Sequence, residues 1–165
     1  MSEALEGWSE FNVAMVGATA ALAGLLIVAM SVNIAEIMRS PALPPRAAAS
    51  IAALVLALAA GALGLVPAQP PVLYGIEVLL GSIVAAAFQV HAIRVIADDD
   101  RAATPVERAG KGLLGVLPLA AFLVGGVLLI AGAAAAGLVA VAFGSVLAVI
   151  AAIVMAWVVL VEVLR

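Results

Sequence analysis

Two ionisable side chains inside a long apolar run are the residues of this sequence most suited to chemistry. Glu77 and His91 lie fourteen residues apart in the run that covers about residues 71–96. On a helix this spacing puts both side chains on one face, about 21 Å apart along the axis. Ionisable residues within a membrane helix are energetically costly and commonly serve proton or ion transfer. We therefore expect Glu77 and His91 to mark an ion or proton path.

A structural role for the same two residues stays open. Glu77 lies six residues into its run, so it would be only about 9 Å below the start of the helix. A charge at that depth costs less than one at mid-membrane. Between Glu77 and His91 the shared face carries Gly81, Val84 and Phe88, which offer no polar relay. Two unrelated polar residues near the two membrane surfaces would give the same pattern.

Polar residues near the far ends of the first and third apolar runs form a second group. Asn33 and Glu36 lie at the end of the first run, and Gln89 and Arg94 lie toward the end of the third. If each run crosses the membrane once, the first and third cross in the same direction, so these residues share one depth. We expect Asn33 and Gln89 to be further candidates for the ion or proton path.

Glu36 is the acid of this second group, and it has three possible partners. They are Arg94, His91 and its own neighbour Arg39. We expect Glu36, Arg94 and Arg39 to form an inner polar layer, in which each contact between helices contributes about 0.6 kcal/mol. The layer could stabilise the bundle or form a gate at its cytoplasmic mouth.

Small residues recur on one face of the first run. Gly17, Ala21 and Gly24 have the spacing that lets two helix backbones approach closely. The partner helix can belong to the same chain or to another copy, and the sequence leaves both open. In the fourth run, Pro118 predicts a kink, because proline lacks the N–H of a helical residue.

These residues belong to a chain that is 67% hydrophobic and 10% charged, whereas a soluble domain carries about 25% charged residues. Runs of about 20 apolar residues predict membrane-spanning helices. The sequence therefore predicts an all-α integral membrane bundle of five transmembrane helices, in one domain over residues 1–165. The predicted spans cover about residues 12–38, 46–66, 71–96, 111–131 and 138–164.

The first eleven residues predict a short interfacial helix before the first span. Leu5, Trp8 and Phe11 recur at helical spacing, and three glutamates lie on another stripe. Such a segment lies in the membrane surface with its apolar side turned toward the lipid.

The basic residues predict the orientation of the chain. All seven fall in the first gap, the third gap or the C-terminal segment, or beside them, which is one side of the five-span arrangement. Lys and Arg concentrate on the cytoplasmic side of membrane proteins. We therefore expect the N-terminus outside, the C-terminus in the cytoplasm, and a multi-pass protein of the cell (inner) membrane. The basic residues are Arg39, Arg46, Arg94, Arg101, Arg108, Lys111 and Arg165.

Several classes of function are disfavoured by what the sequence contains. With no cysteine and one histidine, disulfides, thiolate sites and histidine-rich metal sites are excluded within one chain. No zinc, phosphate-binding or nucleophile motif is found, so we expect no catalytic residues, no metal and no cofactor. No basic patch suggests nucleic acid. The expected partners are the lipid bilayer and either further copies of the chain or another membrane protein.

The first third of the chain carries a recognisable pattern. It consists of residues 17–26, GATAALAGLL, then Ser31-Val32-Asn33-Ile34, then Pro41-Ala42-Leu43-Pro44 and Arg46. Over residues 8–67 this pattern resembles an uncharacterised group of small bacterial polytopic membrane proteins. Some members are labelled modulators of a membrane-anchored ATP-dependent protease, so the resemblance implies a regulatory membrane subunit as one possible function.

Two functions from different classes follow from these patterns. The first is a homo-oligomeric membrane channel that conducts ions or protons, since five slim helices leave little room for a pore within one chain. The second is a non-catalytic accessory or regulatory subunit of a larger membrane complex. Short loops and many closely packing residues fit both functions.

Overall fold

Helices make up the ordered elements of this computed structural model, which describes residues 3–99 and 105–162. Five of the helices are long and apolar enough to cross a membrane, as the sequence predicts. Three short segments lie outside the described residues. They are residues 1–2 and 163–165 at the two chain ends, and residues 100–104 in the third predicted gap. The five long helices are α2 (Ser9–Val32), α4 (Leu43–Leu63), α5 (Pro71–Asp99), α6 (Pro105–Ile130) and α7 (Ala134–Trp157).

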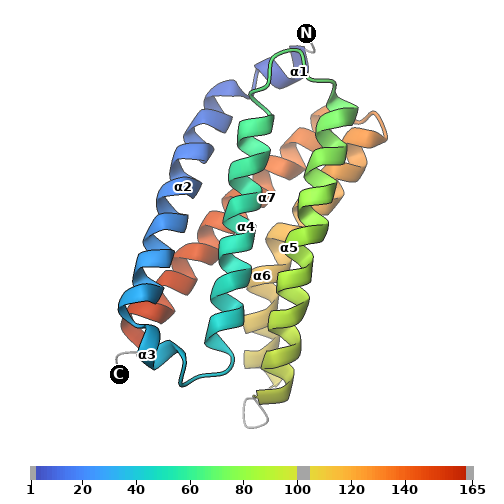
Figure 1. The fold of residues 1–165 in the computed structure, drawn as a ribbon. Coiled ribbons are helices and arrows are strands. Elements are labelled where there is room, and N and C mark those ends of the chain that lie inside the picture. Colours follow the sequence, from blue (N-terminus) through green and yellow to red (C-terminus); the bar gives the residue numbers. More distant parts are fainter. Residues whose placement is uncertain (1–2, 100–104, 163–165) are drawn as a thin grey trace.

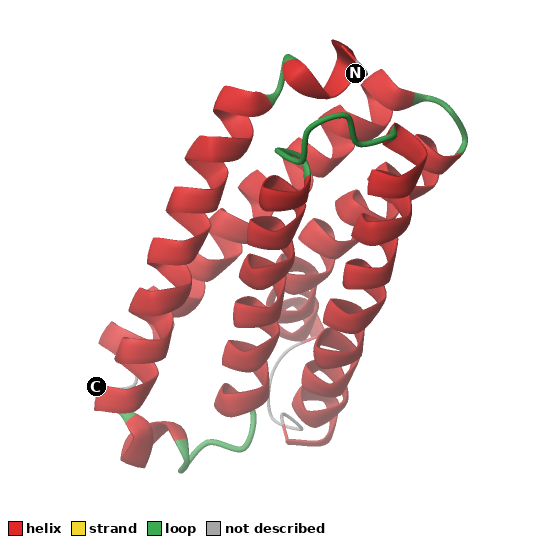
Figure 2. Cartoon of the chain, turned by 45° about the horizontal axis from the view of Figure 1, so that its top comes forward, coloured by secondary structure: helices red, strands yellow, loops and turns green. Residues whose placement is uncertain are grey.

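The long helices lie roughly along a common axis, and their connections lie at the two ends of the bundle (Figure 1, Figure 2). Each helix packs on the next along the chain, and α7 returns to contact α4 and α2. We call the end that carries α1 (Glu3–Glu6) the α1 end. The opposite end carries α3 (Ile34–Ile37) and the close of α7, and we call it the α3 end.

Proline and glycine set the helix boundaries. Pro44 and Pro45 lie in the first turn of α4, and Pro71 begins α5, positions where a missing N–H leaves no helical acceptor unpaired. Between α6 and α7 the chain reverses within residues 131–133, where Gly132 takes a φ of 86°. A residue with a side chain rarely adopts that conformation.

Glycines also let the long helices approach one another closely. A methyl group placed at Gly137 of α7 would lie 2.9 Å from the backbone nitrogen of Leu129 in α6. At Gly61 of α4 it would lie 3.3 Å from the carbonyl oxygen of Asn12 in α2. Phe122, with 0% of its surface exposed, packs against Gly144 in the centre of the bundle. The spans are therefore held by backbone-to-backbone packing as well as by apolar side chains.

The N-terminal segment differs from the predicted interfacial helix over residues 1–11. Its helix α1 is a single turn, and α2 begins at Ser9, directly after Trp8. Leu5 is buried, and Trp8 packs against the core with its ring edge-on to Phe11 at 5.7 Å. The aromatic residues of this segment thus pack at the α1 end of the bundle, and the location of the segment in the membrane surface stays a prediction.

The first span is shorter than predicted, because α2 ends at Val32 and residue 38 lies beyond it. Asn33 leaves the helical conformation, with φ −105° and ψ 20°. Its side-chain amide donates to the carbonyl of Ala29, 3.2 Å away, and to the carbonyl of Val159, 3.4 Å away. Asparagine side chains compete in this way with the helical backbone.

Candidate functional site

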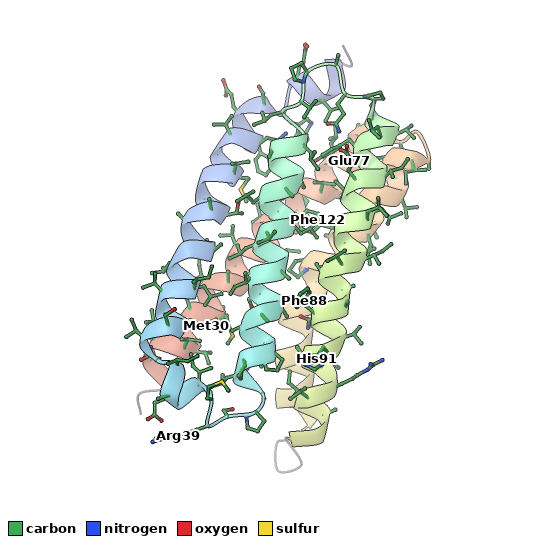
Figure 3. The ribbon with its side chains drawn as sticks, in the orientation of Figure 1. Met30, Arg39, Glu77, Phe88, His91 and Phe122 are labelled. Atoms are coloured by element: carbon green, nitrogen blue, oxygen red, sulfur yellow. The ribbon has the colours of Figure 1, made fainter. Side chains whose placement is uncertain are left out.

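Glu77 lies at the α1 end of the bundle, between α4 and α5 (Figure 3). Its carboxylate accepts a hydrogen bond from the side-chain amide of Gln69 in the loop before α5. Gln69 is buried, with 6% of its surface exposed, and Glu77 is half-buried. An amide donor is what a carboxylate needs at a depth where water is scarce. Gln69 was not among the residues predicted for this site, although its place in a proline-bounded loop directly before α5 is a signal in the sequence.

Tyr74, one turn before Glu77, ties α5 to α4 at the same end. The tyrosine is 1% exposed, and its hydroxyl donates to the carbonyl oxygen of Ala60 at 3.1 Å. A buried hydroxyl needs such a partner. Two separate side-chain hydrogen bonds, Gln69 to Glu77 and Tyr74 to Ala60, therefore hold the α4–α5 connection at this end.

The loop that carries Gln69 encloses a cavity of about 220 Å³. Leu5, Glu6 and Ser9 line one side, and residues 64–69 line the other. Within this loop, Ala68 has a φ of 58°, a left-handed conformation that costs a residue with a side chain about 1–2 kcal/mol. That conformation immediately precedes Gln69, so it helps to turn the Gln69 side chain toward Glu77.

Because Gln69 and Glu77 are hydrogen-bonded, we expect substitutions at the two positions to have non-additive effects on the free energy of unfolding. We expect Gln69→Leu to destabilise the protein by about 1 kcal/mol, because the Glu77 carboxylate loses its donor while it stays half-buried. The double variant Gln69→Leu, Glu77→Leu should recover most of that loss, since no carboxylate is then left without a donor. Unfolding by detergent denaturation gives both free energies. If the two substitutions add without coupling, the hydrogen bond does not stabilise the fold.

His91 lies toward the other end of α5, and the structure does not bring it near Glu77. His91 and Arg94 are exposed on α5. Val84 and Phe88, between Glu77 and His91, are 62% and 47% exposed. The predicted stripe is therefore an exposed and mainly apolar surface for most of its length, and its Glu77 end is turned toward the Gln69 loop.

Gln89, a third candidate for the path, joins α5 to α6. It is 7% exposed, its amide donates to the carbonyl of Gly112 at 3.5 Å, and its side chain packs directly on Gly115. With Arg46 and Ser50 it lines a cavity of about 30 Å³ near the α3 end. A space of that size holds about one water molecule.

Pro118 lies one turn after Gly115 in α6 and is buried. The helix runs through it from Pro105 to Ile130, so the predicted kink stays a prediction. Because proline has no N–H, it cannot donate to the carbonyl of Leu114, which lines the same small cavity. The carbonyl oxygen of Leu114 is thus an additional hydrogen-bond acceptor near Gln89.

Asn33, the fourth candidate, lies at the junction of two irregular helix ends. Its bond to the carbonyl of Val159 reaches the π-helix η1 (Val158–Glu162) that follows α7. Interruptions of this kind leave backbone groups free for side-chain partners. Asn33 is therefore placed as a link between α2 and the end of α7, at a distance from Gln89 on α5.

Glu36 pairs with its neighbour Arg39, which was one of its three expected partners. The Arg39 guanidinium donates to both carboxylate oxygens, at 2.6 and 2.8 Å. Among the described residues Glu36 forms no ion pair with Arg94 or His91, because α4 packs between α2 and α5. The expected inner layer is thereby corrected to a local pair on α3 and the turn after it.

The ion pair between Glu36 and Arg39 is expected to contribute little to the free energy of unfolding. Both side chains are well exposed, at 75% for Arg39 and 40% for Glu36, and exposed pairs contribute about 0.2–1 kcal/mol at most. We expect Glu36→Gln to change the free energy of unfolding by no more than about 0.5 kcal/mol. Detergent denaturation at low and high salt measures the change. A loss of several times that size would show that Glu36 serves more than Arg39.

The small-residue face of α2 points away from the rest of the chain. A methyl group at Gly17 or at Gly24 would meet no atom within 4 Å, and Ala21 between them is exposed. Most glycines of the other spans behave differently, although Gly112 of α6 also meets no atom within 4 Å. Added methyl groups at Gly61, Gly75, Gly125, Gly126, Gly137 and Gly144 would each lie within 3.1 Å of another helix.

The hydroxyl groups in the middle of the bundle face inward and are bonded to their own helices. Thr19, Ser82 and Ser145 are buried, and each donates to the carbonyl four residues earlier, at 2.6 to 3.0 Å. Within residues 3–99 and 105–162 no three His, Asp or Glu residues are grouped as metal ligands.

Comparisons with protein-family models, curated proteins and solved structures find no match to this chain.

Proposed function

We propose that this chain is a non-catalytic accessory or regulatory subunit that binds other membrane-spanning helices through α2. One observation carries the proposal: Gly17 and Gly24 lie on a face that the chain's own bundle leaves unpacked. We call this face, with Ala21 between the two glycines, the α2 face. Its occupant is a helix of a second copy or of another membrane protein.

The cost of glycine supports an interface on the α2 face. In a helix glycine is less favourable than alanine by about 1 kcal/mol, so a glycine is expected where something needs its lack of a side chain. Close helix contacts explain Gly61, Gly75, Gly125, Gly126 and Gly137 within the chain. At the α2 face a second helix backbone can approach in the same way.

The polarity of the outer surface favours an accessory subunit over a channel. Along α5, between Glu77 and His91, the exposed large side chains are apolar, and the buried hydroxyls are satisfied within their own helices. An ion pore between copies needs polar groups or backbone carbonyls along its length. The homo-oligomeric channel is supported by the half-buried carboxylate of Glu77, and it stays the second candidate.

The orientation proposed for this subunit follows the distribution of basic residues. Arg39 and Arg46 lie at the α3 end, which we place in the cytoplasm, and the α1 end we place outside. Acidic residues lie at both ends, Glu6 and Glu77 at the α1 end and Glu36 at the α3 end, so the orientation rests on the basic residues alone. The membrane proposed is the inner membrane of a bacterial cell.

The α2 face is tested by the mass of the complex extracted gently from its native membrane. We expect the wild-type chain to leave the membrane bound to further copies or to a second protein in fixed ratio. Gly17→Leu and Gly24→Leu should reduce the bound share about tenfold, a loss of about 1.4 kcal/mol. Ala87→Leu, at an exposed position on α5, is the control and should behave as wild type.

A monomer from wild-type membranes, or equal assembly of the Gly24→Leu variant, would contradict the interface. If the complex holds copies of this chain alone, ion flux through reconstituted vesicles separates the two functions. A Glu77→Gln variant with altered conductance would then favour the channel, and absence of conductance would favour the accessory subunit.

A further inference from the structure

The small cavity near the α3 end is lined by polar residues from two helices and by a backbone acceptor from a third. Its volume is about 30 Å³, and its lining includes Arg46 and Ser50 of α4, Gln89 of α5 and Leu114 of α6. Residues of α7, among them Met155, line the remaining side. An apolar cavity stays dry, whereas a cavity with two or more polar partners binds water. The hydrogen bonds of these residues therefore decide what the cavity holds.

Gln89 brings to this cavity an amide that the protein satisfies only in part. Its N–H₂ group donates to the carbonyl of Gly112 at 3.5 Å, a long distance for such a bond. Within the part of the chain that the structure describes, no group donates to the amide oxygen of Gln89. Because Gln89 is buried, this oxygen needs a donor that lies inside the cavity.

Ser50 differs from the hydroxyl residues in the middle of the bundle. Thr19, Ser82 and Ser145 each donate to the carbonyl four residues earlier in their own helix. Ser50 makes no such bond, nor any other hydrogen bond, to the residues that the structure describes. Its half-buried hydroxyl can therefore both donate and accept within the cavity.

Leu114 contributes an acceptor from the backbone of α6. Four positions later stands Pro118, so the Leu114 carbonyl lacks the N–H that would close a helical turn. Membrane helices tolerate proline where side chains or ordered waters satisfy the freed backbone group. Gly115 follows Leu114, and a methyl group there would overlap the Gln89 amide. The amide therefore lies directly on the α6 backbone, close to the freed carbonyl.

The charge and the hydrogen-bonding groups of the lining favour a neutral ligand. The guanidinium of Arg46 disfavours a metal cation, and the acceptors of Gln89 and Leu114 disfavour an anion. A water molecule donates to acceptors and accepts from a hydroxyl, so it matches a lining that contains both. The cavity volume of about 30 Å³ admits one water, which needs at least about 10–15 Å³, and excludes larger organic molecules.

We propose that this cavity binds one ordered water molecule that joins α4, α5 and α6. The water donates to the Gln89 amide oxygen and to the Leu114 carbonyl, and it accepts from the Ser50 hydroxyl. It thereby replaces the helical hydrogen bond that Pro118 removes. This site involves no residue of the α2 face, so it holds whether or not the chain assembles through α2.

The test is radiolytic footprinting of the full chain in lipid nanodiscs, with oxidation read by mass spectrometry. Short X-ray pulses convert water into hydroxyl radicals, which oxidise methionine side chains close to that water. Met155 lines the cavity although it is only 4% exposed, whereas Met38 at the α3 end is 67% exposed. We expect both methionines to be oxidised. Oxidation of Met38 with Met155 left intact would overturn the proposal, because the cavity would then be dry.

Two matched serine variants separate a bound water from solvent that passes through. We expect Ser50→Ala to lower Met155 oxidation about fivefold, the effect of losing one net hydrogen bond. Ser145→Ala removes a hydroxyl bonded within its own helix and should leave Met155 oxidation unchanged. Equal oxidation in the two variants would contradict the site.

A change of anion separates water from chloride as the ligand. Sulfate is too large for the cavity, so replacing chloride by sulfate in the buffer should leave Met155 oxidation of the wild-type chain unchanged. A rise in Met155 oxidation in sulfate would show that chloride occupies the cavity, and would contradict the proposal.

Discussion

One added methyl group at Gly137 is expected to destabilise the bundle by about 2 kcal/mol, whereas the same addition at Gly24 should be neutral or stabilising by up to about 1 kcal/mol. At Gly137 the new methyl would meet the backbone nitrogen of Leu129 at 2.9 Å and the carbonyl oxygen of Gly125 at 3.0 Å. Backbone atoms cannot turn aside as a flexible side chain can, so α6 and α7 must move apart. At Gly24 no atom lies within 4 Å.

The measurement is the free energy of unfolding of Gly137→Ala and Gly24→Ala by detergent denaturation, with both proteins held as monomers. Gly125→Ala, on the other side of the same contact, is expected to resemble Gly137→Ala, because its methyl would meet Val141 and Gly137. Equal stability of the Gly137 and Gly24 variants would show that α6 and α7 are less closely packed than described.

Phe122→Ala is expected to lower the free energy of unfolding by about 2–3 kcal/mol. The ring has no exposed surface and packs on Gly144, where an added methyl would lie 3.0 Å from Cδ2. Removing it leaves a cavity that the neighbouring helices fill incompletely. The loss lies below that of a soluble core, since the unfolded chain in a membrane keeps its apolar side chains in lipid.

A matched substitution separates size from position for this residue. Phe143, on the adjacent helix, is 63% exposed, so Phe143→Ala should change stability by less than about 0.5 kcal/mol. The double variant Phe122→Ala, Gly144→Leu should regain part of the loss, because the larger residue grows into the space of the ring. If Phe122→Ala proves as mild as Phe143→Ala, the ring does not support the core as described.

The five spans were predictable because the signal is spread over many residues. Any apolar run of about 20 residues must bury its backbone hydrogen bonds within a helix when it lies in lipid. The break before α4 and the start of α5 were also predictable, since proline acts locally through its own backbone. Helix boundaries that depend on contacts between distant segments were not, and the early end of α2 at Asn33 is one of them.

The candidate site was predictable only in part, because a sequence gives the face of a helix but not what packs on it. Glu77 and His91 do lie along one helix, yet Glu77 meets Gln69 from a loop and His91 stays exposed. Of the three expected partners of Glu36, the local Arg39 is the one it pairs with, since α4 lies between its helix and that of Arg94 and His91. Helix order around the bundle decides such contacts, and no local pattern encodes it.

The short connection between α4 and α5 has a consequence for how the chain enters a membrane. In the orientation proposed above, with the α1 end outside, Gln69, Tyr74 and Glu77 reach the far surface together, and each must leave water on the way. When α4 and α5 insert as one hairpin, the amide of Gln69 can accompany the carboxylate of Glu77, and Tyr74 can already meet Ala60. The hairpin then crosses with the Glu77 carboxylate and the Tyr74 hydroxyl each hydrogen-bonded, at a lower barrier than α5 would face alone.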